Sequence, residues 1–293
     1  MIRRRRFRAM GTDVELLVES ASDSASGDAI EAAEREIHRL EGLLSRFRSD
    51  SELSRLNRLG AIIAGPELAE VVDLALAGRE STGGRFDPTV HDALVAAGYD
   101  RSFELMDLDD AAGAPASPTG CGGSVRLDRS TRAISLDEGV RLDLGGIAKG
   151  YCAERVSDLL SAAGPCLVNI GGDLATRGVP EDGAWVVGID TAEGTVSLNL
   201  ERGAIATSGR DRRRWRRDGG EAHHVIDPGT ARPAETDLVR VTVVAATAAW
   251  GEVLATGFLV AGADAAAREA DALGVPSVLV LESGPTRWAG GLS

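Results

Sequence analysis

Glu252 and Thr256 lie four residues apart in an apolar stretch that we expect to form a helix from about Thr247 to Val260. At this spacing both side chains project from one face of the helix. A carboxylate and a hydroxyl offer hard oxygen ligands, which suit Mg²⁺ better than zinc or copper. The spacing also fits a solvated polar face, or a threonine that bonds its own backbone one turn back. A magnesium site is therefore one of three interpretations.

The only lysine of the chain, Lys149, lies in the segment LDLGGIAKG at residues 142–150. A compact ammonium can meet a requirement that the wide fork of an arginine cannot, although chance retention in an arginine-rich composition is the alternative. Gly145 and Gly146 permit a tight turn before a helix expected at 148–160, whose N-terminus would suit a phosphate or a carboxylate. The spacings GxxxxGK[ST] and GxGxxG are absent, so this segment is not a P-loop.

Polar residues stand beside glycines or prolines at three further places. Asp87 precedes Pro88, which also fits a helix N-cap. The run NIGGD at 169–173 follows an apolar strand, and a turn explains it equally well. His223 and His224 fall on an expected strand, where neighbouring side chains point to opposite faces. At most one of the two histidines can therefore serve a given pocket.

Apolar periodicity predicts the elements that must position these residues. Residues 27–47 place apolar side chains at the spacing of a core-facing helix, and Pro66 suits the first position of another. Residues 110–123, rich in Ala, Gly, Pro and Ser, predict a surface loop. Helices are expected at 27–47, 66–80, 148–160 and 247–260, and strands at 14–19, 124–127, 133–136, 141–144, 166–170, 185–189, 203–207, 225–226, 239–245 and 278–281. This order predicts an α/β fold of layered α+β type with no Rossmann unit.

Composition limits the classes of protein to consider. The 293 residues are 43% hydrophobic, enough for a single domain over residues 1–293 or for two closely packed halves. A net charge of −13 argues against a nucleic-acid partner or an anionic membrane surface. No segment approaches the roughly 18–20 apolar residues that a membrane span requires, so no membrane insertion is expected.

Location follows from the start of the chain and from the cysteines. The basic run Arg3–Arg6 lacks the apolar region and cleavage site of a signal peptide. Cys121, Cys152 and Cys166 lack metal-ligand spacing and cannot all pair with one another, which fits a reducing compartment. We expect a cytoplasmic protein.

Together these residues resemble the FAD:protein FMN transferase family, the ApbE-like flavin transferases. The similar motifs run in order along most of the chain, at 10–12, 45–57, 86–90, 142–150, 169–173, 224–228 and the helix with Glu252 and Thr256. The resemblance implies a T-fold-like α/β architecture, FAD as substrate and Mg²⁺ as cofactor. It also implies transfer of FMN to a Thr or Ser hydroxyl of an acceptor protein with an FMN-binding domain. A phosphoester forms and AMP is released.

The resemblance assigns roles by position. His224 matches the histidine proposed to assist the acceptor hydroxyl. The magnesium positions are the Gly146 backbone, Glu252 and Thr256, and the FAD contacts are Met10, Phe47, Arg85, Phe86, Asp87, Asp143, Lys149 and Ile226.

Three positions depart from the family pattern. The family usually has Asp at the position of Glu252, and it often has Tyr near Phe47. Its Asp-Pro-x-Thr-Gly turn reads Asp-Pro-Gly-Thr-Ala at residues 227–231, so a glycine stands at 229 and Ala231 takes the final position. Two other functions share the expected pocket, a magnesium-dependent FAD pyrophosphatase and an FAD-binding protein without turnover.

Overall fold

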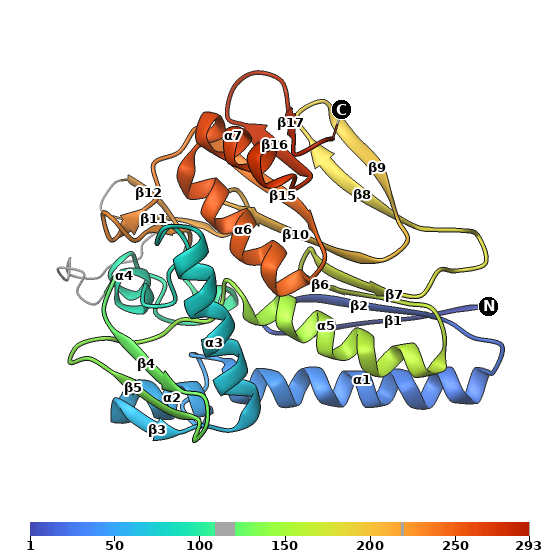
Figure 1. Ribbon diagram of the computed structural model, residues 1–293, viewed down its shortest axis with the longest axis horizontal. Coiled ribbons are helices and arrows are strands. Elements are labelled where there is room, and N and C mark those ends of the chain that lie inside the picture. Colours follow the sequence, from blue (N-terminus) through green and yellow to red (C-terminus); the bar gives the residue numbers. More distant parts are fainter. Residues whose placement is uncertain (109–120, 218–219, 293) are drawn as a thin grey trace.

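The computed structural model describes residues 1–108, 121–217 and 220–292, and an eight-stranded sheet forms its centre (Figure 1). Each neighbouring pair in this sheet is antiparallel. The strand order is β1 (Ile2–Ala9), β2 (Thr12–Glu19), β6 (Cys166–Ile170), β7 (Asp173–Arg177), β10 (Gly203–Gly209), β15 (Leu238–Ala245), β16 (Ser277–Leu281) and β17 (Arg287–Ala289).

Helices cover one face of the sheet (Figure 1). Val14, Leu16 and Val18 alternate along β2 and point to this face, because successive strand side chains project to opposite sides. They pack in the main core with apolar residues of the covering helices. The helices on the sheet are α1 (Asp23–Leu44), α5 (Ala148–Leu160) and α6 (Ala248–Ala261). α3 (Pro66–Ser81) packs against α1 and α6, and α7 (Ala263–Leu273) lies beside β16 and β17.

The opposite face of the sheet is covered in part by the hairpin of β8 (Trp185–Thr191) and β9 (Gly194–Leu200). Leu167 and Leu174 of the sheet pack there against Trp185 and Val187 of the hairpin. The sheet is therefore packed on both faces.

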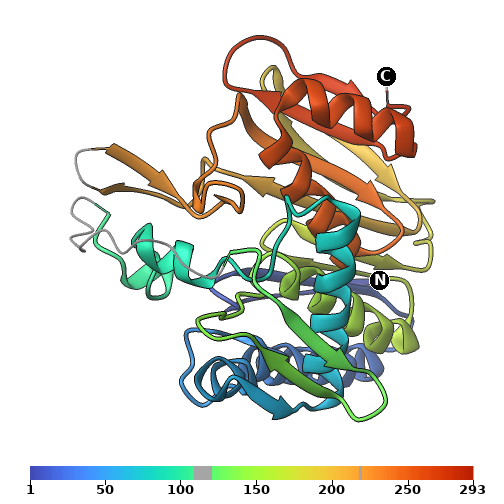
Figure 2. The same ribbon diagram turned by 60° about the vertical axis from the view of Figure 1, so that its left-hand side comes forward.

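Smaller elements surround one end of the sheet. The hairpin of β11 and β12 projects from the body above α4, as Figure 2 shows. The smaller elements are α2 (Glu52–Leu59), β3 (Ala61–Ile63), α4 (His91–Ala96), β4 (Val125–Asp128), β5 (Ala133–Leu136), β11 (Arg214–Arg217), β12 (Gly220–His223), β13 (Ile226–Asp227) and β14 (Arg232–Pro233), with short 3₁₀ turns at Phe103–Leu105 and Ser161–Ala163.

The predicted mixed fold without a Rossmann unit is confirmed, since the central sheet is antiparallel throughout its length. The helix predicted at 27–47 begins earlier, because Ser22 caps it and accepts a hydrogen bond from the Ala25 N–H at 3.3 Å. It ends at Leu44, so Phe47 lies beyond the helix. Most of the loop predicted at 110–123 falls outside the described residues.

The strand predicted at 141–144 is wrong. The Asn57 side chain takes up both backbone groups of Leu142, accepting from its N–H at 2.7 Å and donating to its carbonyl at 2.8 Å. The Asp143 N–H donates to the Pro88 carbonyl at 2.8 Å. With these groups bonded elsewhere, the alternating segment has no strand to pair with.

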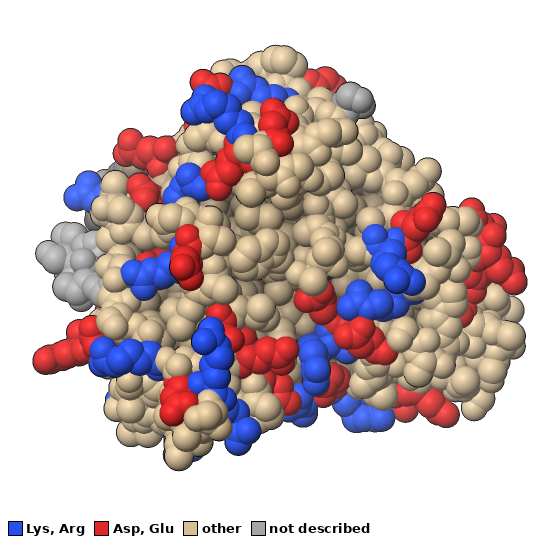
Figure 3. All heavy atoms as spheres, in the orientation of Figure 1, with Lys and Arg blue, Asp and Glu red and all other residues tan. Residues whose placement is uncertain are grey.

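The surface seen in Figure 3 carries basic and acidic side chains interspersed, without a large area of one sign. No helix within the described parts of the chain combines the length and the hydrophobicity that crossing a bilayer would take.

Candidate active site

A cavity of about 970 Å³ lies at one end of the sheet and extends across the N-terminus of α5 and the nearby turns. Its wall contains residues from the β1–β2 turn, the segment after α1, the turn before α5, the end of β10 and one face of α6. All the candidate residues line this one cavity, namely Met10, Phe47, Arg85, Phe86, Asp87, Asp143, Gly146, Lys149, His224, Ile226, Glu252 and Thr256.

Lys149 lies between two buried carboxylates. Its Nζ donates to Asp173 Oδ2 at 2.5 Å and also to Glu252 Oε1. The side chains of Asp173 and Glu252 are only 1% and 2% exposed. Burial alone would lower the pKa of Lys149, but the two carboxylates outweigh it and raise the pKa above its usual value. Lys149 therefore stays charged, and its charge compensates the two acids.

Gly150 explains how Lys149 reaches Glu252. A Cβ at Gly150 would lie 2.5 Å from the carbonyl oxygen of Ala248, so only glycine allows α5 to approach the start of α6 this closely. The close approach also lets the Gly150 N–H donate to Glu252 Oε2 at 2.9 Å. Burial and the neighbouring Asp173 raise the pKa of Glu252, and Lys149 opposes that rise.

The oxygens proposed for magnesium converge at the same wall. Gly146 lies near Thr256, since a Cβ at Gly146 would stand 4.0 Å from Thr256 Oγ1. The Thr256 hydroxyl shares a hydrogen bond of 2.8 Å with Ser208, and Glu252 is buried one turn earlier on α6. A solvated polar face is therefore wrong for this helix.

The donor set fits a hard cation in its chemistry, because a backbone carbonyl, a carboxylate and a hydroxyl are all oxygen ligands. The described residues hold no cluster of three or more His, Cys, Asp or Glu side chains suited to a metal. A single carboxylate is consistent with Mg²⁺, which often binds through one or two carboxylates together with substrate phosphates. In the structure, the same carboxylate forms an ion pair with Lys149.

A second wall combines a cation with two aromatic rings. Arg46 forms a buried ion pair with Asp143. Its guanidinium carbon lies 4.2 Å from the Phe47 ring centroid and 4.8 Å from that of Tyr99. Asp143 also accepts a hydrogen bond from the Gly145 N–H at 2.7 Å, which holds the glycine turn. Phe47 is 41% exposed and presents an aromatic face to the cavity.

The segment 85–87 is organised by side-chain hydrogen bonds. Asp87 Oδ1 accepts from the N–H and the hydroxyl of Thr89 at 2.8 and 2.7 Å. Because α4 begins only at His91, the N-cap interpretation of Asp87 is wrong. Arg85 forms an ion pair with Glu269 of α7. Phe86, the next residue in the chain, is buried.

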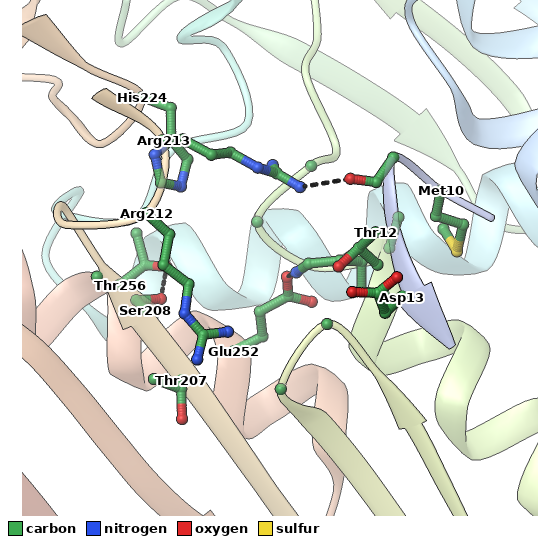
Figure 4. Close-up of a pocket in the computed structure, with 18 of the residues that line it drawn as sticks. Met10, Thr12, Asp13, Thr207, Ser208, Arg212, Arg213, His224, Glu252 and Thr256 are labelled. Atoms are coloured by element: carbon green, nitrogen blue, oxygen red, sulfur yellow. Dashed lines mark hydrogen bonds and ion pairs between the residues drawn. The ribbon is translucent and has the colours of Figure 1, made fainter. Parts of the chain in front are cut away.

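His224 lines the cavity, as Figure 4 shows, whereas His223 does not. The strand β12 ends at His223, whose Nε2 lies 3.2 Å from the Ala234 carbonyl oxygen. Burial, followed by the charge of Arg213, lowers the pKa of His224 well below its usual value. Its Nδ1 has no hydrogen-bond partner among the described residues. The imidazole in the cavity wall is therefore neutral near pH 7.

Met10 and Ile226 complete the set. Met10 occupies the β1–β2 turn with a φ of 53°, and its N–H donates to Glu41 Oε1 at 2.8 Å. Ile226 is buried at the start of β13, two residues after His224.

A family-level comparison supports the resemblance. The model of the ApbE family matches residues 10–279. The chain belongs to the ApbE family. A Vibrio cholerae relative named FAD:protein FMN transferase is 30% identical over 253 residues, which are 82% of this chain and 75% of the relative. A Salmonella typhimurium relative of the same name is 29% identical over 259 residues, which are 83% of this chain and 73% of the relative.

Solved structures of ApbE proteins have the same fold. The ApbE protein of Thermotoga maritima superposes with a TM-score of 0.87 at 27% identity, covering 99% of this chain and 97% of its own. The flavin transferase ApbE of Vibrio cholerae gives a TM-score of 0.81 at 25% identity, covering 99% and 97%.

Several site residues of this ApbE-family chain had no role in the sequence analysis. Asp173, which pairs with Lys149 without itself lining the cavity, lies in the run 169–173 but was not predicted to pair with the lysine. Arg46 lies in the motif at 45–57, but no role was predicted for it. A usable signal was available for Asp173, because a buried lysine requires a carboxylate and Asp173 follows an apolar strand and two glycines. For Arg46, Ser208 and Arg213, no spacing in the sequence distinguishes them from surface residues.

Proposed function

We propose that this protein is a magnesium-dependent FAD:protein FMN transferase, formed by residues 1–293 as a single transferase domain. The FMN part of FAD would pass to a Thr or Ser hydroxyl of an acceptor protein with an FMN-binding domain, and AMP would be released. Relatives with this name cover most of the chain. The observation that carries the proposal is the convergence of all the family-matched positions on one cavity of about 970 Å³.

The reaction requires one bond to form and one to break. The acceptor hydroxyl oxygen attacks the FMN phosphorus, and the bond from that phosphorus to the bridging oxygen breaks. The bridging oxygen leaves with the electron pair as part of the AMP phosphate. His224 is suited to take the hydroxyl proton, because its lowered pKa keeps the imidazole neutral near pH 7.

Other residues of the cavity would bind and orient the substrate. Phe47, which is 41% exposed, offers aromatic surface to a flavin, and the buried Tyr99 ring supports it with a centroid distance of 5.5 Å. The Gly146 backbone, Glu252 and Thr256 would hold Mg²⁺. When bound there, Mg²⁺ would neutralise charge on the diphosphate oxygens.

The experiment uses the protein with FAD, Mg²⁺ and a purified FMN-binding-domain acceptor. Intact mass spectrometry should show an acceptor mass gain equal to FMN, and peptide mapping should locate it on a Thr or Ser. An acceptor with that hydroxyl replaced by alanine is the matched control and should stay unmodified. Free FMN and AMP with an unmodified acceptor would favour the pyrophosphatase, whereas bound FAD without AMP would favour a binding protein.

A further inference from the structure

Arg212 and Arg213 lie on the segment between β10 and β11 and line the cavity. Figure 4 shows both side chains directed into it, Arg212 toward the side of Thr207 and Glu252, and Arg213 toward the β1–β2 turn. Neither arginine belongs to the positions that the family resemblance assigns. The two guanidinium groups thus reach into the cavity from one short segment.

Among the arginines and the lysine that line the cavity, only these two have no carboxylate partner among the described residues. Arg213 makes a single weak hydrogen bond, to the Gly11 carbonyl at 3.5 Å, and no hydrogen bond or ion pair is found for Arg212. The other arginines and the lysine that line the cavity all pair with Asp or Glu, namely Arg4, Arg8, Arg46, Arg48, Arg85, Lys149 and Arg240.

The pairing difference is informative because carboxylates are abundant in this chain. It has 45 acidic residues against 32 basic ones. A guanidinium presents its donors in a planar fork that matches the oxygens of a phosphate. Two such groups without carboxylate partners, in a cavity whose other cations are neutralised, are suited to an anion with several oxygens.

The segment that carries them is fixed to the sheet. The Arg210 N–H donates to the Val239 carbonyl at 3.0 Å, and its Nε donates to the Leu238 carbonyl at 2.9 Å. Asp211 accepts from Arg240 Nη2 at 2.5 Å. The backbone just before both arginines is therefore fixed, and only their side chains have to become ordered when an anion binds.

We propose that Arg212 and Arg213 bind the diphosphate of FAD and stabilise the negative charge that gathers on the departing AMP phosphate. This inference rests on the proposed function and adds to it the side chains that recognise the diphosphate. Arg212 faces the wall with the Glu252 oxygens, and Arg213 faces the turn at Gly11. Both guanidiniums would donate hydrogen bonds to the diphosphate oxygens.

The test measures ligand binding without acceptor or turnover, in EDTA, from the change in flavin fluorescence. R212Q and R213Q are compared with wild type for FAD and for riboflavin, which lacks phosphate. R214Q is the matched control, because Arg214 is exposed, pairs with Glu221 and does not line the cavity. Each cavity variant should weaken FAD binding roughly tenfold or more, as expected for a lost hydrogen bond to a charged group. Riboflavin binding, and every value for R214Q, should stay as in wild type.

The lysine variants R212K and R213K separate charge from fold, since they should recover part of the FAD affinity at an unchanged unfolding temperature. Unchanged FAD affinity in both glutamine variants would overturn the inference. Unchanged FAD affinity together with a raised KM for the acceptor would also overturn the inference. That result would indicate that the arginines bind the acceptor protein. Equal losses for FAD and riboflavin would indicate a structural role instead.

The two proposals can fail separately. Wild-type protein that binds FAD through Arg212 and Arg213 but never modifies an acceptor would refute the transferase and leave the diphosphate contact in place. Wild-type protein that binds no FAD would overturn both.

Discussion

Replacing Lys149 with methionine should destabilise the protein more than most single substitutions do. The change removes the positive charge between Asp173 and Glu252, whose side chains are 1% and 2% exposed. Removing one partner of a buried ion pair costs about 3–5 kcal/mol. Because the Lys149 side chain is 16% exposed, we expect the lower end, about 3 kcal/mol. At about 2–4 °C per kcal/mol, the Tm would fall by roughly 6–12 °C.

The loss should depend on pH with a defined sign. Burial and Asp173 raise the pKa of Glu252, and removing Lys149 takes away the charge that opposes this rise. A carboxyl whose pKa is higher in the folded state contributes stability that is present below its unfolded pKa and is lost as the pH rises through the folded pKa. Glu252 has a pKa of about 8 in the wild type, so it is protonated below that pH in both folded proteins. The gap between variant and wild type should therefore stay constant up to about pH 8 and widen from about pH 8 to about pH 10.

The assay is urea unfolding followed by tryptophan fluorescence, in EDTA, at several pH values across that range. Lys149→Arg is the matched control for charge, because the guanidinium keeps the charge but is wider than the ammonium. We expect it to fall between methionine and wild type in stability. Wild-type stability of the methionine variant at all pH values, or a gap that narrows as the pH rises, would refute the reasoning. If the arginine variant is as stable as wild type, the lysine at this position meets no requirement that an arginine cannot meet.

Further substitutions test the other parts of the site. His224→Ala should leave FAD bound but slow FMN transfer by about 10²–10⁴-fold, whereas His223→Ala, outside the cavity, should transfer at the wild-type rate. Glu252→Gln should raise the Mg²⁺ concentration that gives half-maximal transfer, and an unchanged Mg²⁺ titration would remove this carboxylate from the metal site. Gly150→Ala should lower stability by about 1–3 kcal/mol in urea unfolding, since its Cβ would meet the backbone of α6, while Gly42→Ala in α1 should not.

The local elements could be predicted where the apolar pattern is strong. Helices α3 and α5 begin and end within one residue of the prediction, because Pro66 and the glycines around each helix mark their ends. The strand β1 was missed since Ile2–Ala9 is rich in arginine and lies at the sheet edge. Its charges are compensated by acids from elsewhere, for example Arg3 by Asp23 and Arg5 by Glu34. Such compensation depends on tertiary contacts and leaves no periodic signal.

The sequence identified the motifs that contain the site residues, but not the contacts between those residues. The pairing of Lys149 with Asp173 and Glu252 joins residues 24 and 103 positions apart, and no local rule connects them. The same holds for the strand wrongly expected at 141–144, which is disrupted by the distant side chain of Asn57. In the sequence, the segment with Arg212 has the pattern of an ordinary basic loop. Only the fold shows that this segment lines the cavity.

The ratio of AMP released to acceptor modified tests the central proposal most directly. Wild-type protein would be mixed with FAD, Mg²⁺ and a limiting amount of acceptor, with AMP measured by chromatography and the flavinylated acceptor by intact mass. The account predicts one AMP for each acceptor modified, with both products stopping when the acceptor is exhausted. AMP that continues to form after that point, or an acceptor that gains no mass, would contradict it.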